Sequence, residues 1–138
     1  MGAVWSVRPL VDRYPESSMA AFDDVVRLTA HLPEVTLSTS YGTPALKVRT
    51  KSFCRLWGDR DRSQADVGEG EVLVIFCDLD EKEFLLAESD GSIFTTSHYD
   101  GYGAVLVRLD EIDAETLADL LFDSYLLRAP SKIQRQFS

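Results

Sequence analysis

Residues 41–53 read Tyr-Gly-Thr-Pro-Ala-Leu-Lys-Val-Arg-Thr-Lys-Ser-Phe, and this stretch predicts a β-hairpin. Its Gly-Thr-Pro step is typical of a turn or bulge before a strand. In the strand that follows, Leu46 and Val48 share one face, because successive side chains of a strand point to opposite faces of a sheet. Lys47 and Arg49 therefore share the other face, and the hairpin holds the densest positive charge of the chain.

Further strands extend this hairpin into a sheet. Alternating and apolar runs predict strands over residues 36–40, 45–48, 52–57, 72–77, 93–96 and 104–109. The run over 72–77 is apolar at every position, which favours a central strand covered on both faces. A parallel sheet would need a crossover helix between most strands, so an antiparallel sheet is expected.

Three helices accompany the strands. They are predicted near residues 22–32, near residues 79–90, and after an N-cap at Asp113. The second has a capping-box pattern and an apolar staple at its start, formed by Asp80 with Glu83 and by Leu79 with Phe84. The apolar stripe of the third consists of Leu117, Leu120, Leu121 and Tyr125. This order of elements predicts an α+β two-layer sandwich, with the helices packed on one face of an antiparallel sheet.

Length, composition and cysteine usage restrict the class of protein. With 138 residues, of which 45% are hydrophobic, the chain fits one domain. Its longest apolar run is far shorter than the roughly 18 residues that cross a bilayer, and the start lacks the pattern of a secretory signal. Cys54 and Cys77 lie in predicted strands without Cys-x-x-Cys spacing, which favours buried, reduced thiols and a cytoplasmic location.

Charge is distributed unevenly along the chain. Residues 1–65 sum to +2, residues 66–123 to −14 and residues 124–138 to +3, which gives the net charge of −9. The isoelectric point is near 4.6, whereas specific nucleic-acid binders tend toward a basic surface and a high isoelectric point. A basic hairpin on an acidic body predicts weak anion binding at one wing of the molecule.

A set of motifs together resembles the MmcQ/YjbR family over about residues 20–132. The motifs are Leu32-Pro33-Glu34-Val35, Tyr41-Gly42-Thr43-Pro44 with Lys47, Lys51-Ser52-Phe53, the Phe-Thr-Thr-Ser-His-Tyr-Asp-Gly-Tyr loop over 94–102, the strand over 105–109, and Arg128-Ala129-Pro130. The resemblance implies a frataxin-like (CyaY-like) fold, also compared with a double-wing DNA-binding domain. Family members are commonly labelled DNA-binding, and the resemblance brings no catalytic residues with it.

The resemblance also divides the chain into three segments. Residues 1–17 are expected to be an N-terminal extension, residues 18–130 a single MmcQ/YjbR-like domain, and residues 131–138 a flexible basic tail. The tail is polar and follows Pro130, which cannot continue the preceding helix.

The first candidate site is the basic hairpin, with DNA or another polyanion as its partner. Lys47, Arg49, Lys51 and Arg55 could contact phosphates together, since the first two share a strand face and the third lies at the hairpin tip. The alternative is a solvated strand face without a ligand. The acidic body opposes the approach of DNA through long-range repulsion.

The second candidate site is the loop that contains His98, Tyr99 and Tyr102. Its polar and aromatic side chains could hydrogen-bond a small ligand or a partner protein. The alternative is a turn in which Asp100 and its glycine neighbours shape the backbone while the rings pack on the sheet.

No motif for catalysis, a cofactor or a metal is present in the sequence. It contains no P-loop, dinucleotide glycine pattern, serine elbow or zinc spacing. A monomeric, non-enzymatic protein without a cofactor or a membrane partner is therefore expected, binding DNA weakly or another protein.

Overall fold

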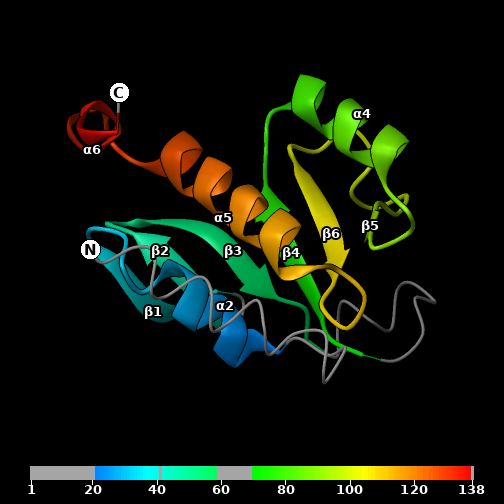
Figure 1. Ribbon diagram of the computed structural model, residues 1–138, viewed down its shortest axis with the longest axis horizontal. Helices are drawn as coiled ribbons and strands as arrows, with labels where there is room; N and C mark the ends of the chain where they lie inside the picture. Colours follow the sequence, from blue (N-terminus) through cyan, green and yellow to red (C-terminus); the bar gives the residue numbers. More distant parts are fainter. Residues whose placement is uncertain (1–20, 41, 59–69, 138) are drawn as a thin grey trace.

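The computed structural model describes residues 21–40, 42–58 and 70–137 (Figure 1). Its elements in chain order are α2 (Phe22–Thr29), β1 (Val35–Ser40), β2 (Thr43–Val48), β3 (Lys51–Leu56), β4 (Val72–Phe76), α4 (Leu79–Glu88), β5 (Ile93–Phe94), β6 (Ala104–Arg108), α5 (Ala114–Arg128) and α6 (Ser131–Gln136). The six strands form one sheet in the order β1-β2-β3-β4-β6-β5, and every neighbouring pair is antiparallel. The predicted α+β fold with an antiparallel sheet is confirmed.

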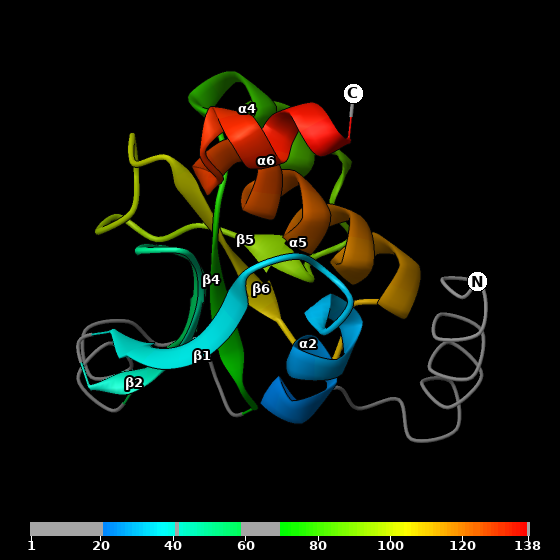
Figure 2. The ribbon, with the colours of Figure 1, turned by 90° about the vertical axis from the view of Figure 1, so that its left-hand side faces the viewer.

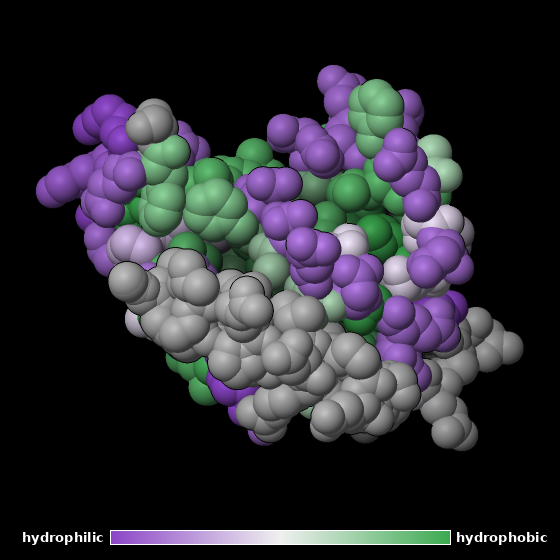
Figure 3. All heavy atoms as spheres, in the orientation of Figure 1, coloured by the Kyte–Doolittle hydropathy of each residue, from purple (hydrophilic) through white to green (hydrophobic). Residues whose placement is uncertain are grey.

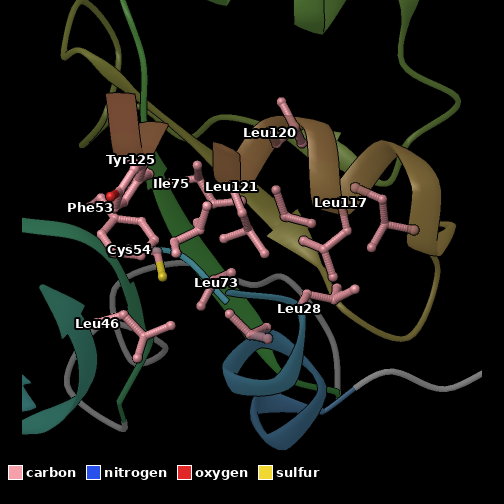
Figure 4. Packing of buried hydrophobic residues seen from close by; sticks show 14 of the residues in the cluster. Leu28, Leu46, Phe53, Cys54, Leu73, Ile75, Leu117, Leu120, Leu121 and Tyr125 are labelled. Carbon is pink, nitrogen blue, oxygen red and sulfur yellow. The ribbon is translucent and has the colours of Figure 1, made fainter. Parts of the chain in front are cut away.

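Helices α5 and α2 cover one face of this sheet (Figures 1 and 2). The main hydrophobic core lies between the two layers, where Leu28 of α2, Leu73 and Ile75 of β4, and Leu117 and Leu121 of α5 point toward one another (Figure 4). Burying a side chain of this size stabilises the fold by roughly 1.5 to 3 kcal/mol. The sandwich is therefore held mainly by contacts between α5 and the central strands.

The start and the buried face of α5 follow the sequence pattern. The side chain of Asp113 accepts a hydrogen bond from the backbone N–H of Thr116 at 2.9 Å, as an N-cap does. Leu117, Leu120, Leu121 and Tyr125 are all buried. The predicted cap and the predicted apolar stripe of this helix are both confirmed.

The other face of the sheet, which we call the second face, carries Val72, Val74 and Leu106. A smaller apolar cluster lies on it, in which Trp57 and Tyr99 pack against these strand residues. Tyr99 belongs to the loop between β5 and β6, so this loop folds back over the sheet. Strand β4 is thus buried on both faces, which explains why its sequence is apolar at every position.

Three local expectations are wrong. Leu79 is 52% exposed and Phe84 is 70% exposed, so the predicted staple at the start of α4 does not form. The predicted capping box of Asp80 and Glu83 is also wrong, because Asp80 lies within the helix and the N-cap is Asp78, whose side chain makes no capping hydrogen bond. Residues 131–136, expected in a flexible tail, form α6, in which Ile133 is fully buried. The ring of Phe137 contacts those of Phe122 and Tyr125 at 5.3 and 6.0 Å between centroids, and these contacts hold the segment on α5.

The prediction of two buried, reduced thiols is confirmed in part. Both thiols are free; Cys54 is buried, whereas Cys77 is half-buried at the end of β4. Within the three described ranges, no helix has the length and apolar character needed to cross a bilayer.

Candidate functional site

Lys47 and Lys51 lie where the hairpin pattern places them. Lys47 is half-buried in β2 and Lys51 is exposed at the first position of β3. Leu46 and Val48 point into the main core, so the side chain of Lys47 lies on the second face of the sheet. These two lysines remain available to a ligand.

Arg49 does not share the strand face of Lys47, and this expectation is wrong. Strand β2 ends at Val48, and Arg49 occupies the following turn with a left-handed backbone, φ +58°. Its guanidinium donates to both carboxylate oxygens of Glu34, at 2.7 and 3.3 Å. The positive charge of Arg49 is therefore already neutralised by a neighbouring acid.

Arg55 is not an exposed phosphate ligand either. Its side chain is buried on the second face, where one guanidinium nitrogen donates to the hydroxyl of Tyr99 at 3.1 Å. The other lies 3.4 Å from the hydroxyl of Thr43 in β2. Arg55 thus joins the hairpin to the loop after β5, and the two candidate sites that the sequence treated separately become neighbours on one face.

Lys82 of α4 holds the loop over residues 95–103 in place through hydrogen bonds to its backbone. Its ammonium group is buried and donates to the backbone carbonyls of Tyr99 and Tyr102, at 2.6 and 2.8 Å. Burial lowers the pKa of Lys82 because the charged form loses its hydration. No sequence motif pointed to Lys82, since its acceptors are backbone atoms that lie 17 and 20 residues away.

The aromatic side chains of this loop form a continuous row. The rings of His98 and Tyr99 lie 5.4 Å apart, those of Tyr99 and Tyr102 lie 5.7 Å apart, and the ring of Phe76 lies 6.3 Å from that of Tyr102. Tyr99 is buried, but His98 is exposed and Tyr102 is 51% exposed. The loop therefore presents one histidine and one tyrosine ring to solvent from a rigid base.

Charge is segregated between the sheet and the helices. None of the six described strands contains Asp or Glu; their charged residues are Lys47, Lys51, Arg55 and Arg108. Arg108 lies over the ring of Phe94 at 4.3 Å on the second face. The carboxylates of the described residues lie instead on helices and in turns, so the acidic composition does not extend to the strands of the second face.

Comparisons with known proteins agree with this architecture. The family model described as YjbR matches residues 30–127. The chain belongs to the YjbR family. The uncharacterised proteins Mb2600 of Mycobacterium bovis and Rv2570 of Mycobacterium tuberculosis are each 33% identical over 129 residues, covering 86% of this chain and 96% of theirs. The crystal structure of Deinococcus radiodurans protein DR2400, of the domain family DUF419, has a TM-score of 0.60 and 26% identity over 80% of this chain and 79% of that one.

Among the described residues, no three His, Cys, Asp or Glu side chains come together in a way that could hold a metal ion. His98 makes a ring contact with Tyr99 and is otherwise turned to solvent. What the second face offers a ligand is a small set of cations, exposed rings and a fixed backbone.

Proposed function

We propose that this YjbR protein is a non-enzymatic binding protein that takes up single-stranded nucleic acid weakly on the second face of its sheet. The observation that carries the proposal is the charge segregation: the described strands hold no carboxylate, and Lys47, the buried Arg55 and Arg108 lie on the second face. A phosphate backbone following this face would meet Lys47. Lys51 is paired with Val48, which points into the main core, so its exposed side chain could reach such a backbone only around the hairpin turn. The leading hypothesis from the sequence, a polyanion on the hairpin, is thereby moved from the hairpin alone to the sheet face.

Aromatic rings favour a single strand over a duplex. Tyr102 is half exposed and is in contact with the partly buried ring of Phe76. A base that stacks on an aromatic side chain contributes roughly 1 to 3 kcal/mol, with little dependence on sequence. In a duplex the bases are already stacked on each other, so this contribution is open to a single strand.

The binding is expected to be weak because the body of the protein is acidic. A net charge of −9 repels nucleic acid at long range. This repulsion is screened beyond about 8 to 10 Å in physiological salt. The phosphates that reach Lys47 and Lys51 are therefore held by short-range contacts.

Fluorescence anisotropy with a labelled oligothymidylate, measured at several low salt concentrations, tests the proposal. If two or three phosphates are neutralised, log affinity should fall against log salt with a slope of about −1.5 to −2. Replacing Lys47 and Lys51 by Ala should reduce the steepness of this slope by about 1.4. The duplex of the same length should bind more weakly than the single strand.

Arg27→Ala is the matched control for Lys47→Ala. Each substitution removes one positive charge, but Arg27 lies on α2 and is paired with Asp24. Affinity should fall with Lys47→Ala and stay close to that of the wild type with Arg27→Ala. Equal effects of both substitutions, or no binding of the oligonucleotide at the lowest salt, would contradict a nucleic-acid site on this face.

The loop alone is the second candidate, as a site for a peptide or a small ligand. The observation that favours it is the double hydrogen bond from Lys82, which fixes the backbone under His98 and Tyr102 before any ligand arrives. Pre-organisation of this kind raises affinity because less freedom is lost on binding. If the loop binds a peptide or small ligand, His98→Ala should abolish that binding, and replacing Lys47 and Lys51 by Ala should not change it. If the second face binds an oligonucleotide, His98→Ala should not change the affinity for it.

A further inference from the structure

A groove on the helical side of the molecule has the character of a binding site. It lies between α4 and the C-terminal half of α5, is open to solvent and has a cavity volume of about 50 Å³. Figure 3 shows it as a hollow with apolar side chains on its floor. Its lining comprises Ile75, Phe76, Cys77, Asp78, Glu81, Leu85, Val105, Leu120, Asp123 and Leu127.

The walls of the groove are leucines from the two helices. Leu85 comes from α4, and Leu120 and Leu127 lie two turns apart on α5. Leu127 is 41% exposed although it lies beside this apolar floor. An apolar side chain placed between these leucines would remove additional apolar surface from water, which favours binding.

The rim of the groove is acidic and carries no opposite charge. Asp78, Glu81 and Asp123 line it, and no lysine or arginine does. The two ion pairs found among the described residues involve Asp24 and Glu34, so none of the three rim carboxylates takes part in one. Burial raises the pKa of Asp123, and the neighbouring carboxylates of Glu81 and Asp119 raise it further. The side chains that line the groove are therefore acidic or uncharged; the nearby guanidinium of Arg128 lies over the ring of Phe76 at 4.5 Å.

We propose that this groove docks a basic amphipathic helix of a partner protein. Such a helix inserts apolar residues spaced at i, i+3, i+4 and i+7 into a groove between helices. Lysine or arginine residues beside its apolar face would meet Asp78, Glu81 and Asp123. The same carboxylates repel a phosphate backbone, so the groove and the proposed nucleic-acid face are expected to bind different ligands. Phe76 borders both, but neither proposal rests on the other.

A designed peptide of leucine and lysine, with leucine at helical spacing on one face, is the probe. Isothermal titration calorimetry should show saturable binding of one peptide per protein. Two control peptides separate the requirements. One has the same composition in an order that places leucine on all sides, and the other has glutamate in place of lysine; both should bind at least about tenfold more weakly.

Charge reversal at matched positions tests where the peptide binds. Glu81→Lys with Asp123→Lys changes two groove carboxylates, while Glu83→Lys with Glu115→Lys makes the same change of charge at exposed positions of the same two helices that do not line the groove. The groove variant should lose at least about tenfold in affinity and the control variant much less, since like charges at a contact act more strongly than distant ones. Equal losses in both variants would mean that the peptide responds only to net charge, and the proposal would be wrong.

The alkylation rate of Cys77 gives a second test of where the peptide binds. Unspecific electrostatic attraction of the peptide to the protein would not change this rate. Its half-buried thiol lines the groove, whereas Cys54 is buried in the main core. Saturation with the leucine–lysine peptide should slow the alkylation of Cys77 several-fold and leave Cys54 unchanged. Unaltered alkylation of Cys77 at saturation would overturn the proposed site, even if the peptide binds elsewhere.

Discussion

Glu34 and Arg49 form an ion pair that connects the start of β1 with the turn from β2 to β3. Besides the two-point ion pair of their side chains, the backbone N–H of Arg49 donates to the carbonyl of Glu34 at 3.2 Å. Both residues have a left-handed backbone, with φ of +60° and +58°, a conformation that is unfavourable for residues other than glycine. The ion pair therefore links two strained positions and fixes the geometry of the hairpin.

The backbone and charge contributions of Arg49 can be separated by two substitutions. Arg49→Gly and Arg49→Ala both remove the ion pair, but glycine adopts the left-handed conformation without steric cost. In urea unfolding, Arg49→Ala should therefore be less stable than Arg49→Gly. The same midpoint for both variants would show that the turn relaxes to another conformation.

The charge contribution has a defined pH dependence. The hydrogen bond from Arg49 holds the pKa of Glu34 below its usual range. Because the folded-state pKa is lowered, this stabilisation is present at neutral pH and is lost as the pH falls through it. The stability difference between wild type and Arg49→Gly should shrink on acidification.

The sequence predicted the fold well because the decisive signals are local. The cap at Asp113, the stripe of α5 and the apolar run of β4 each depend on residues close together in the chain, and each is found in the structure. The staple at Leu79 and Phe84 is equally local but is absent. At that position the packing of Leu85 and Leu86 against the core and the buried bonds of Lys82 determine how α4 is rotated.

A third prediction concerns the buried face of α5. Leu117→Ala or Leu121→Ala should each reduce the free energy of unfolding by about 2 to 5 kcal/mol, since each leaves a cavity between helix and sheet. Both side chains are almost completely buried. Phe84→Ala on α4, where the ring is 70% exposed, is the control and should change stability by less than about 0.5 kcal/mol. Similar small changes at all three positions would mean that α5 presents another face to the sheet.

A fourth prediction concerns the two thiols. Burial raises the pKa of Cys77 to about 11 and that of Cys54 still further. Native alkylation of Cys77 should therefore be slow and rise about tenfold per pH unit, because the thiolate is the reactive form. Cys54 should react only when the protein unfolds, so its rate should follow denaturant concentration. Rapid labelling of Cys54 without denaturant would contradict its place in the core.

The candidate site was predicted less completely than the fold, because its contacts connect distant parts of the chain. Lys47 and Lys51 could be placed from strand alternation. The burial of Arg55 could not, since its partner Tyr99 lies 44 residues away in the sequence. The pairing of Arg49 depends on a left-handed turn directly after β2, where the alternation of strand side chains no longer applies.

The last prediction tests whether Lys82 is the residue that fixes the loop after β5. Lys82→Met keeps the length of the side chain but leaves the carbonyls of Tyr99 and Tyr102 without their donor, and buried acceptors that lose a charged partner cost on the order of 2 to 4 kcal/mol. Urea unfolding measures this loss. Hydrogen exchange shows where the loss occurs, because the N–H of Tyr102 donates to the carbonyl of Tyr99 within the loop and should exchange faster in the variant.

Glu83→Met is the control, because it changes an exposed neighbour on the same helix and should alter neither the unfolding nor the exchange. If Lys82→Met unfolds like the wild type and keeps the Tyr102 amide protected, the loop is held by its aromatic packing, and Lys82 does not pre-organise the second face.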